Sequence, residues 1–312
     1  MNIKNNFKNR DFLTLMDFKT DEIQFILDVS QDFKKKYNMK KPHNFFQGRT
    51  IAMIFEKQST RTRFSFQAAI AHLGMQSIFA VPETMQLARD ESIKDTARVI
   101  DRYCDGLIIR TYKQEKIQEY ADYMKHPVIN ALTDLTHPCQ GLADMMTIKE
   151  HKGKIEGNKL AYIGDPWNVC NTLMISCSLL SIDCYVAVPK GWKPNKTILE
   201  FAEDNAKKRN TEMVVTTSLE EAIKDSDIVY ANTFHSMGQK DIEERKNAFA
   251  KYQITNSILS LAKPDAIFMH CLPAYRGEEV TNSVIEGPKS VVFNQAENRI
   301  HTEKAILSLI IP

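Results

Sequence analysis

The chain has 312 residues, enough for about two domains of ordinary size. Hydrophobic residues at 43% and charged residues at 26% are typical of a globular protein and exclude a disordered tail or a coiled coil. The 41 basic and 39 acidic side chains nearly cancel to a net charge of +2, which argues against a dedicated nucleic-acid binder.

Cysteine spacing and hydropathy indicate the setting in which the protein works. No stretch approaches the roughly 18 apolar residues of a membrane span, and the first residues lack the apolar core of a secretory signal. The six cysteines form no CxxC pair, and no HxxxH metal spacing occurs. We therefore expect free thiols in a cytoplasmic protein without membrane partners. The cysteines are Cys104, Cys139, Cys170, Cys177, Cys184 and Cys271.

Apolar strand-like runs alternate with helical patterns in the first half of the chain. We expect strands at residues 49–57, 76–81, 105–110 and 128–132. We expect helices from about residue 60, at 92–103, around 115–123 and from 140 to about 151.

A polar, glycine-containing stretch at residues 151–159 is the candidate domain boundary, and the strand–helix pattern restarts after it. Later strands are expected at 160–165, 184–189, 226–232, 266–273 and 290–294, with a final helix from about Glu297. Asp165 and Pro166 are expected to cap and begin the helix that contains Cys170 and Cys177 on one buried face. The pattern predicts an α/β fold of two domains, residues 1–150 and 151–312, each a parallel sheet flanked by helices.

Polar residues follow the first strand, where ligands collect in parallel sheets. The segment Gln58-Ser59-Thr60-Arg61-Thr62-Arg63 precedes a helix. Hydroxyls, guanidinium groups and the free N–H groups of a helix start together favour an anion such as phosphate. The alternative is an ordinary helix cap with solvated arginines. No GxxxxGK[ST] or post-strand GxGxxG motif is present, which argues against a Walker loop and a dinucleotide fold.

Two further strand ends of the first half carry Arg110 and His137. An isolated histidine is more often structural, but His137 lies in a polar loop next to a helix start, where its imidazole could bind a ligand carbonyl. Arg61, Arg110 and His137 would together suit a small, doubly charged ligand that carries a carbonyl group.

The second half offers polar strand ends as well. Asn168 follows one strand, the segment 232–238 (NTFHSMG) follows another, and His270-Cys271-Leu272-Pro273 follows a third. Cys271 could act as a nucleophile or could be a small apolar side chain lining a pocket, and no neighbouring base in the sequence decides between these interpretations.

These segments together resemble the carbamoyltransferase superfamily, and within it the ornithine carbamoyltransferase branch. The resemblance rests on Phe55-Glu56-Lys57 with residues 59–63, on His137-Pro138-Cys139-Gln140, on Ser236-Met237-Gly238 and on His270-Cys271-Leu272-Pro273, and it is colinear from about residue 10 to the end. The resemblance implies a first domain that binds carbamoyl phosphate and a second that binds the amine, with the last helix returning to the first domain.

Site residues are carried over from this resemblance one by one. The carbamoyl phosphate site would comprise Ser59, Thr60, Arg61, Thr62, Gln86, Arg110, His137, Gln140 and Arg299, with Gln86 reaching the site of a neighbouring subunit. The ornithine site would comprise Leu132, Asn168, Asn232, Ser236, Met237, Cys271 and Leu272. Thr62, Arg110, His137 and Cys271 would act in catalysis, with no cofactor and no metal, in a homotrimer with shared active sites.

The chemistry implied by the resemblance is attack of a neutral amine on the carbamoyl carbon. Thr62, Arg110 and His137 would stabilise the developing oxyanion, and the loss of one such donor usually costs about 10²–10³ in rate. Phosphate would leave into the anion pocket at Arg61.

Two positions depart from the ornithine branch. Asn232 stands where the family usually has an aspartate that binds the α-ammonium group of ornithine, and Pro166-Trp167 replace the usual Gly-Asn. An amide keeps the hydrogen bond but loses the charge, which predicts weaker ornithine binding or a different amine. Trp167 could fill part of the substrate space or could pack under the helix.

The resemblance predicts an enzyme of arginine metabolism that converts ornithine to citrulline. Two alternatives remain at this point. One is carbamoyl transfer to another amine such as putrescine, and the other is a non-catalytic protein that binds carbamoyl phosphate.

Overall fold

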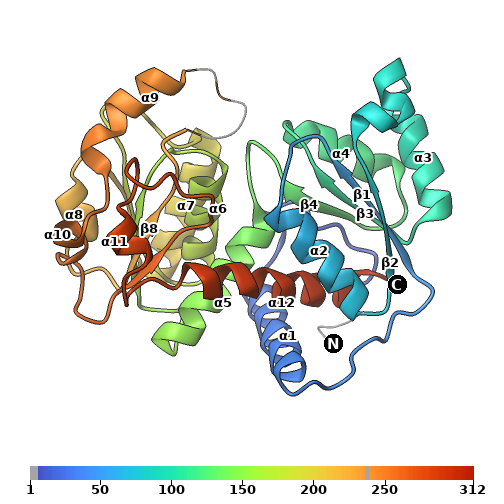
Figure 1. Ribbon diagram of the computed structural model, residues 1–312, viewed down its shortest axis with the longest axis horizontal. Coiled ribbons are helices and arrows are strands. Elements are labelled where there is room, and N and C mark those ends of the chain that lie inside the picture. Colours follow the sequence, from blue (N-terminus) through green and yellow to red (C-terminus); the bar gives the residue numbers. More distant parts are fainter. Residues whose placement is uncertain (1–5, 236–238, 240) are drawn as a thin grey trace. The chain divides into compact units, whose positions relative to one another are not determined.

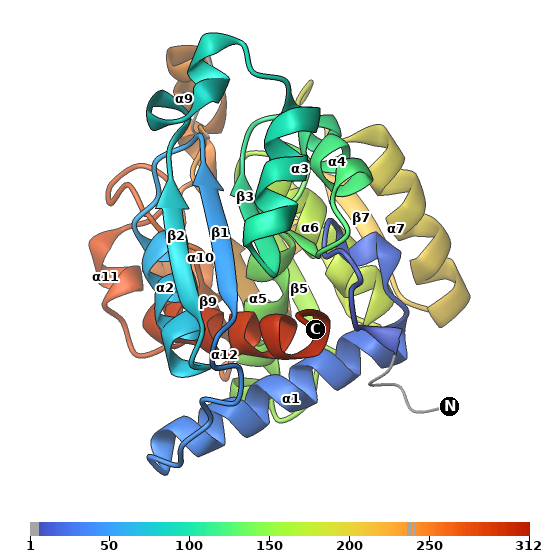
Figure 2. The same cartoon turned by 90° about the vertical axis from the view of Figure 1, so that its right-hand side faces the viewer.

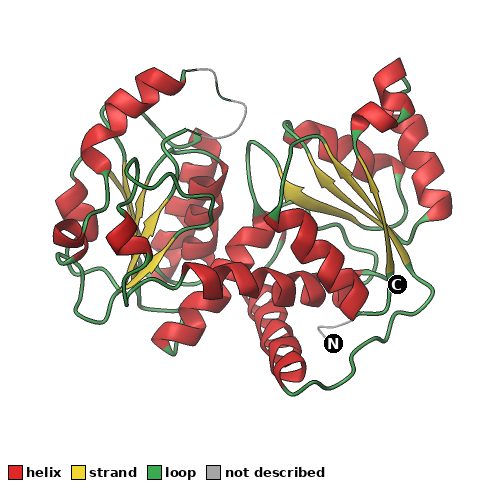
Figure 3. Ribbon diagram, viewed as in Figure 1, coloured by secondary structure: helices red, strands yellow, loops and turns green. Residues whose placement is uncertain are grey.

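The computed structural model describes residues 6–235, 239 and 241–312. The chain divides into two compact units, one formed by residues 1–146 with 297–312 and the other by residues 147–296 (Figure 1). Each unit contains one parallel sheet with helices on both faces (Figure 3). The two-sheet α/β fold expected from the sequence is therefore confirmed.

The sheet of the first unit has four strands in the order β2-β1-β3-β4, all parallel. Its strands are β1 (Thr50–Phe55), β2 (Gln76–Ala80), β3 (Gly106–Arg110) and β4 (Val128–Leu132). Its helices are α1 (Thr20–Asn38), α2 (Arg61–His72), α3 (Ile93–Tyr103) and α4 (Gln114–Tyr123), with short 3₁₀ turns at Leu15–Asp17, Pro82–Thr84 and Gln86–Arg89. The unit also holds most of α5 (Pro138–Lys152) and of α12 (Val292–Ile310).

The helices of this unit lie on opposite faces of its sheet because the chain changes direction after β2. The connection from β1 to β2 runs one way along the sheet, whereas the next two connections run the other way. Right-handed crossovers then place α2 on one face and α3 with α4 on the other, as the view in Figure 2 shows. Ile54, Leu107, Ile109 and Tyr120 are among the buried side chains of the core beneath α3 and α4.

The second unit has five parallel strands in the order β7-β6-β5-β8-β9. They are β5 (Lys159–Ile163), β6 (Asp183–Ala187), β7 (Met213–Thr216), β8 (Ile228–Ala231) and β9 (Ile267–Met269). Its helices are α6 (Asn168–Leu179), α7 (Lys196–Arg209), α8 (Leu219–Ile223), α9 (Ile242–Phe249), α10 (Asn256–Leu259) and α11 (Asn282–Ile285), with a 3₁₀ turn at Ala250–Tyr252.

Helix α6 is the central helix of the second unit. Every one of its twelve residues is buried, and Cys170 and Cys177 are both fully inaccessible, as their seven-residue spacing predicted. A helix that is buried on every face must be covered on all sides, and its polar residues, such as Thr172 and Ser176, bond back to carbonyls of the helix itself. Figure 1 shows α6 and α7 on one side of the sheet and α8 and α10 on the other.

Two expectations about local structure are wrong. Residues 290–294 do not form a strand: Ser290 makes a single bridge to Phe268, and helix α12 already begins at Val292. Asp165 does not cap α6, because the helix begins at Asn168 after Trp167. The Asp165 carboxylate instead binds the guanidinium of Arg245 at 2.6 Å, and a buried ion pair of this kind outcompetes a capping role.

Among the described residues, no helix is long and apolar enough to cross a bilayer.

Each sheet has one point where neighbouring strands lead into connections that run in opposite directions. In the first unit this point lies between β1 and β3, and in the second it lies between β5 and β8. Side chains that follow these strands lie at the carboxyl edge of the sheet, the crevice position at which open α/β sheets bind ligands.

Gly164 marks the closest backbone approach at the crevice of the second unit. It directly follows β5 and has φ +149°, and a Cβ at this position would lie 2.6 Å from the carbonyl oxygen of Asn232. The end of β5 can therefore lie against the residue after β8 only if position 164 has no side chain.

We expect Gly164→Ala to lower the free energy of unfolding by about 2–4 kcal/mol, because it combines backbone strain with a clash against backbone. Gly191→Ala is the matched control, since Gly191 also has a positive φ of +94° but has no atom within 4 Å of the added Cβ. It should cost only about 1 kcal/mol. Urea unfolding followed by circular dichroism measures both; equal losses would show that the contact with Asn232 is unimportant.

Candidate active site

The segment after β1 forms the start of helix α2. The Ser59 hydroxyl accepts a hydrogen bond from the backbone N–H of Thr62 at 3.2 Å. Thr60 makes no side-chain capping bond, so the hydroxyls do not all serve as caps. Arg63 stacks on the Phe79 ring at 3.8 Å, whereas Arg61 is half-buried at the helix start.

The Thr62 hydroxyl joins two guanidinium groups. It accepts hydrogen bonds from Arg110 Nη1 at 3.4 Å and from Arg299 Nη2 at 3.3 Å, and all three side chains are buried. Arg110 ends strand β3, and Arg299 lies on helix α12. With both lone pairs of the oxygen engaged, the hydroxyl proton is left to donate to a ligand. Two cations beside one donor favour an anion at this point.

Residues of α5 complete this group. Gln140 Oε1 accepts a hydrogen bond from Arg299 Nη1 at 2.9 Å, and Gln140 Nε2 donates to Asp144 at 2.7 Å. His137 lies just before α5, and its carbonyl accepts from the backbone N–H of Gln140 at 3.0 Å. Burial, together with the charges of Arg299 and Arg110, holds the pKa of His137 well below its ordinary value. The imidazole is therefore neutral near pH 7.

Glu303 is a component of the site that sequence reasoning missed. Its Oε1 accepts hydrogen bonds from Arg299 Nε at 3.1 Å, Arg299 Nη2 at 2.8 Å and the Ser65 hydroxyl at 2.9 Å. Glu303 is fully buried, and this burial raises its pKa to about 7 despite the attraction of Arg299. It lies one helical turn after Arg299, a spacing that could have indicated the pair.

The other two candidates of the first unit differ in position. Gln86 begins an exposed 3₁₀ turn after β2, and within the described part of the chain it makes no hydrogen bond to the other candidates. Leu132 ends strand β4 and pairs with Arg110 of β3. The structure therefore brings together Thr62, Arg110, Gln140 and Arg299 by direct contact, with His137 close to the two arginines.

A hydrogen-bonded chain crosses the crevice of the second unit. The Cys271 thiol donates to Asn232 Oδ1 at 3.3 Å, Asn232 Nδ2 donates to the Tyr162 hydroxyl at 3.2 Å, and Tyr162 donates to the Asp165 carbonyl at 2.6 Å. The amide thus acts as acceptor on one side and donor on the other, which a carboxylate cannot do. Tyr162 was missed because it lies within strand β5 and reads as a core residue.

Buried polar groups fix the loop that carries Cys271 and Leu272. His270 Nδ1 accepts from the backbone N–H of Leu272 at 2.8 Å, and His270 Nε2 donates to Glu279 Oε1 at 3.1 Å. Both His270 and Glu279 are fully inaccessible, and Glu279 also accepts from the Tyr275 N–H at 2.7 Å. Leu272 has a left-handed φ of +57°, which these bonds help to hold.

The remaining candidates of the second unit lie at the start of α6 or outside the described residues. Asn168 is the buried first residue of α6. Trp167 is half-buried immediately before it. Ser236 and Met237 lie outside the described residues. Among the residues the structure describes, no group of three His, Cys, Asp or Glu side chains is arranged to hold a metal ion.

Two parallel sheets, each with a polar cluster at its carboxyl edge, define a two-domain α/β protein of the class that binds ligands at such edges. The chain belongs to the aspartate/ornithine carbamoyltransferase family. The model of the family's carbamoyl-P binding domain matches residues 10–150, and the model of its Asp/Orn binding domain matches residues 156–310.

Individual relatives match over nearly the whole chain. An ornithine carbamoyltransferase of Pyrococcus horikoshii is 46% identical over 305 residues, which are 97% of this chain and 96% of the relative. The solved structure of ornithine carbamoyltransferase from Pyrococcus furiosus is 45% identical and has a TM-score of 0.95 over 98% of both chains. The anabolic ornithine carbamoyltransferase of Campylobacter jejuni is 40% identical, with a TM-score of 0.90 over 96% of this chain and 98% of that one.

The raised pKa of Glu303 predicts how stability depends on pH. The folded protein keeps a proton that the unfolded chain, with its glutamate pKa near 4.5, releases between pH 4.5 and about 7. Stability from this group is complete below pH 4.5 and is lost as the pH rises through 7. The loss amounts to about 3 kcal/mol.

Glu303→Gln should remove this loss while keeping the hydrogen-bonding shape. Urea unfolding between pH 4.5 and 8 should therefore show wild type losing about 3 kcal/mol relative to Glu303→Gln. Glu203→Gln, at an exposed position on α7, should follow the wild-type curve. Parallel curves for wild type and Glu303→Gln would contradict the prediction.

Proposed function

We propose that this protein transfers the carbamoyl group of carbamoyl phosphate to the side-chain amine of L-ornithine, producing citrulline and phosphate. The observation that carries the proposal is the pair of guanidinium groups, Arg110 and Arg299, on the Thr62 hydroxyl at the carboxyl edge of the first sheet. The relatives named above as ornithine carbamoyltransferases support the choice of substrates. The reaction is a step of arginine metabolism.

Carbamoyl phosphate binds in the first unit in this proposal. Its phosphate lies at the start of α2, against Ser59, Thr60, Arg61 and the backbone N–H groups, where the helix dipole favours negative charge. Its carbamoyl oxygen faces the Thr62 hydroxyl, Arg110 and the neutral imidazole of His137. Gln140 holds the carbamoyl NH₂ group. Arg299, fixed by Glu303, adds positive charge next to the leaving phosphate.

The reaction proceeds by attack of the deprotonated amine on the carbamoyl carbon. The C–N bond forms as negative charge develops on the carbamoyl oxygen, and the donors at Thr62, Arg110 and His137 stabilise this oxyanion. The C–O bond to phosphate then breaks, and the departing phosphate accepts the amine proton. Holding two substrates in line supplies roughly 7–11 kcal/mol of the barrier. Because the amine must be neutral, the rate rises toward alkaline pH.

Ornithine binds in the second unit in this proposal, with Cys271 and Leu272 next to its reactive amine. Its amino-acid end meets Asn168, Asn232, Ser236 and Met237. The Asn232 amide already engages Cys271 and Tyr162, so it offers the α-ammonium group a neutral acceptor rather than a carboxylate. This specific observation keeps a second acceptor, such as putrescine, as the alternative function.

The functional test is a panel of amines offered with carbamoyl phosphate to wild type and to Asn232→Asp, with ureido product and phosphate measured together. L-Ornithine should be the best acceptor for wild type. Asn232→Asp should raise kcat/KM for L-ornithine about tenfold, because a charge-assisted hydrogen bond replaces a neutral one. Butylamine, which lacks an α-ammonium group, is the control and should not improve.

Each contrary outcome of this panel has a definite meaning. Product from putrescine but not ornithine would reverse the acceptor assignment. No product from any amine would leave a protein that only binds carbamoyl phosphate. Unchanged ornithine kinetics in Asn232→Asp would show that position 232 does not meet the α-ammonium group.

We further propose that the enzyme is a cytoplasmic homotrimer in which Gln86 completes the site of a neighbouring subunit. Six free cysteines suit a reducing compartment. Gln86 is exposed and makes no hydrogen bond to the Thr62 group of its own chain, as expected of a residue that serves another subunit.

Co-expression of Arg61→Ala and Gln86→Ala chains tests this sharing. Each variant alone should be inactive, whereas mixed trimers should regain about a quarter of the wild-type sites, where an intact Arg61 meets an intact Gln86 from the next chain. Co-expression of Arg61→Ala with Thr62→Ala is the control and should give no recovery. If Gln86→Ala mixtures also fail to recover, Gln86 acts within its own chain or not at all.

A further inference from the structure

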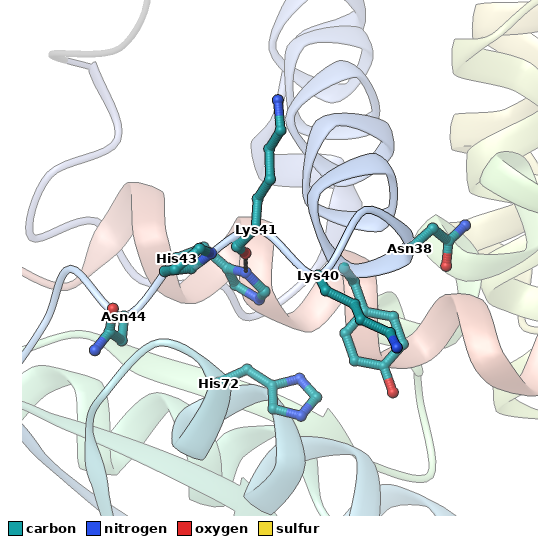
Figure 4. Close-up of a pocket in the computed structure, with 8 residues that line it drawn as sticks. Asn38, Lys40, Lys41, His43, Asn44 and His72 are labelled. Atoms are coloured by element: carbon teal, nitrogen blue, oxygen red, sulfur yellow. Dashed lines mark hydrogen bonds between the residues drawn. The ribbon is translucent and has the colours of Figure 1, made fainter.

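The first unit also carries a pocket that is separate from the Thr62 group. It has a volume of about 630 Å³ and is lined by Tyr37, Asn38, Lys40, Lys41, Pro42, His43, Asn44 and His72. These residues come from the last turn of α1, the segment after it and the last turn of α2. Figure 4 shows the rings of His43 and His72 facing the same hollow and the Lys41 side chain extending away from it.

A buried cation lies behind this pocket. Lys304, on α12, is fully inaccessible, and its ammonium group donates one hydrogen bond, to His43 Nε2 at 3.2 Å. The Phe33 and Tyr37 rings lie 5.6 and 5.1 Å from the ammonium nitrogen. Across the described part of the chain, no carboxylate pairs with Lys304 and no second acceptor binds it. An ammonium group has three donors, and a buried charge without a counter-ion is costly.

Two imidazoles near Lys304 also have a ring nitrogen without a hydrogen-bond partner among the described residues. The Nδ1 atoms of His72 and His301 are buried and have no hydrogen-bond partner. His43 Nδ1 donates to the Lys41 carbonyl at 2.9 Å, so His43 Nε2 is the acceptor for Lys304. His301 Nε2 lies 3.5 Å from the carboxylate of Glu297, which is 41% exposed. Cationic and neutral donors therefore outnumber anionic acceptors around the pocket.

We propose that this pocket binds a small dianion of the phosphate or sulfate type. Oxygens of the ligand accept hydrogen bonds from His72 and Lys40, and the charge of Lys304 acts on the ligand through His43. The lysines around the pocket would repel a metal cation. Burial lowers the pKa of Lys304 only to about 8, so the ammonium group keeps its charge at neutral pH.

Sulfate is the probe, because it stays doubly charged from pH 5 to 9 and its binding reports only on the protein. Isothermal titration calorimetry on Arg61→Ala, which weakens the anion site at α2, should still detect one sulfate per chain. Adding Lys304→Met should weaken this binding about tenfold or more, through loss of the buried charge. Adding Lys41→Met instead is the matched control and should change the affinity less than about twofold, because Lys41 points away from the pocket.

His72→Gln provides a second route if Lys304→Met does not fold, and it should also weaken sulfate binding. The Cε1–H resonances of His43 and His72 should shift together in NMR spectra as sulfate is added. Absence of sulfate binding to Arg61→Ala, or unchanged affinity after both Lys304→Met and His72→Gln, would overturn the proposal.

Discussion

The candidate site of the first unit depends on the guanidinium group of Arg299. This side chain binds Thr62 from α2, Gln140 from α5 and Glu303 from its own helix, so it joins the three helices on which the site is built. The planar guanidinium group with five fixed donors suits this role, since one flexible ammonium group cannot hold three partners at set angles. Glu303 offsets part of the charge, and Arg110 on the same Thr62 hydroxyl keeps the group cationic overall.

The polar group after the strands of the second unit is held by a directed chain of neutral hydrogen bonds, not by charged groups. The thiol of Cys271, the amide of Asn232 and the hydroxyl of Tyr162 each donate onward, and the chain ends at a backbone carbonyl. The Asn232 amide accepts one of these bonds and donates another, so it has partners on both sides without a counter-charge. An amide at position 232 is therefore compatible with a well-ordered hydrogen-bonded chain in the second unit.

Much of the fold could be predicted from the sequence because the strands are buried on both faces. Continuous apolar runs identified β1, β3, β5 and β8 to within two residues. The segment 290–294 was mispredicted for the same reason. Val291 and Val292 form an apolar run beside β9, but Ser290 makes only a single bridge to Phe268 and the chain enters helix α12 at Val292. Periodicity over so few residues does not distinguish a strand from a buried helix start.

Fewer residues of the candidate site than elements of the fold could be predicted from the sequence. Residues after strands, such as Arg110 and Asn232, could be found from topology, whereas Arg299 came only from the family resemblance because it is 189 positions away from Arg110 and lies mid-helix. Tyr162 and Glu279 gave no signal of their own, and Glu303 gave only its spacing of four residues from Arg299. Each is buried and acts through another side chain, so its importance becomes visible only when the partner's hydrogen bonds are traced.

Helices α2 and α12 link the Thr62 group to the pocket beside Lys304. Thr62 is in the first turn of α2 and His72 is its last residue, while Arg299 and Lys304 are five residues apart on α12. Glu303 and Lys304 are adjacent in sequence and have side chains of opposite charge type in different surroundings. The carboxyl group of Glu303 contacts Arg299 and Ser65. The ammonium group of Lys304 contacts His43 and two aromatic rings. Consecutive helical residues point about 100° apart, so one turn of α12 serves both places. A substitution that rotates this turn of α12 must therefore move the side chains at the Thr62 group and those at the pocket beside Lys304 together. The choice of residues at 299–304 is limited by both places at once.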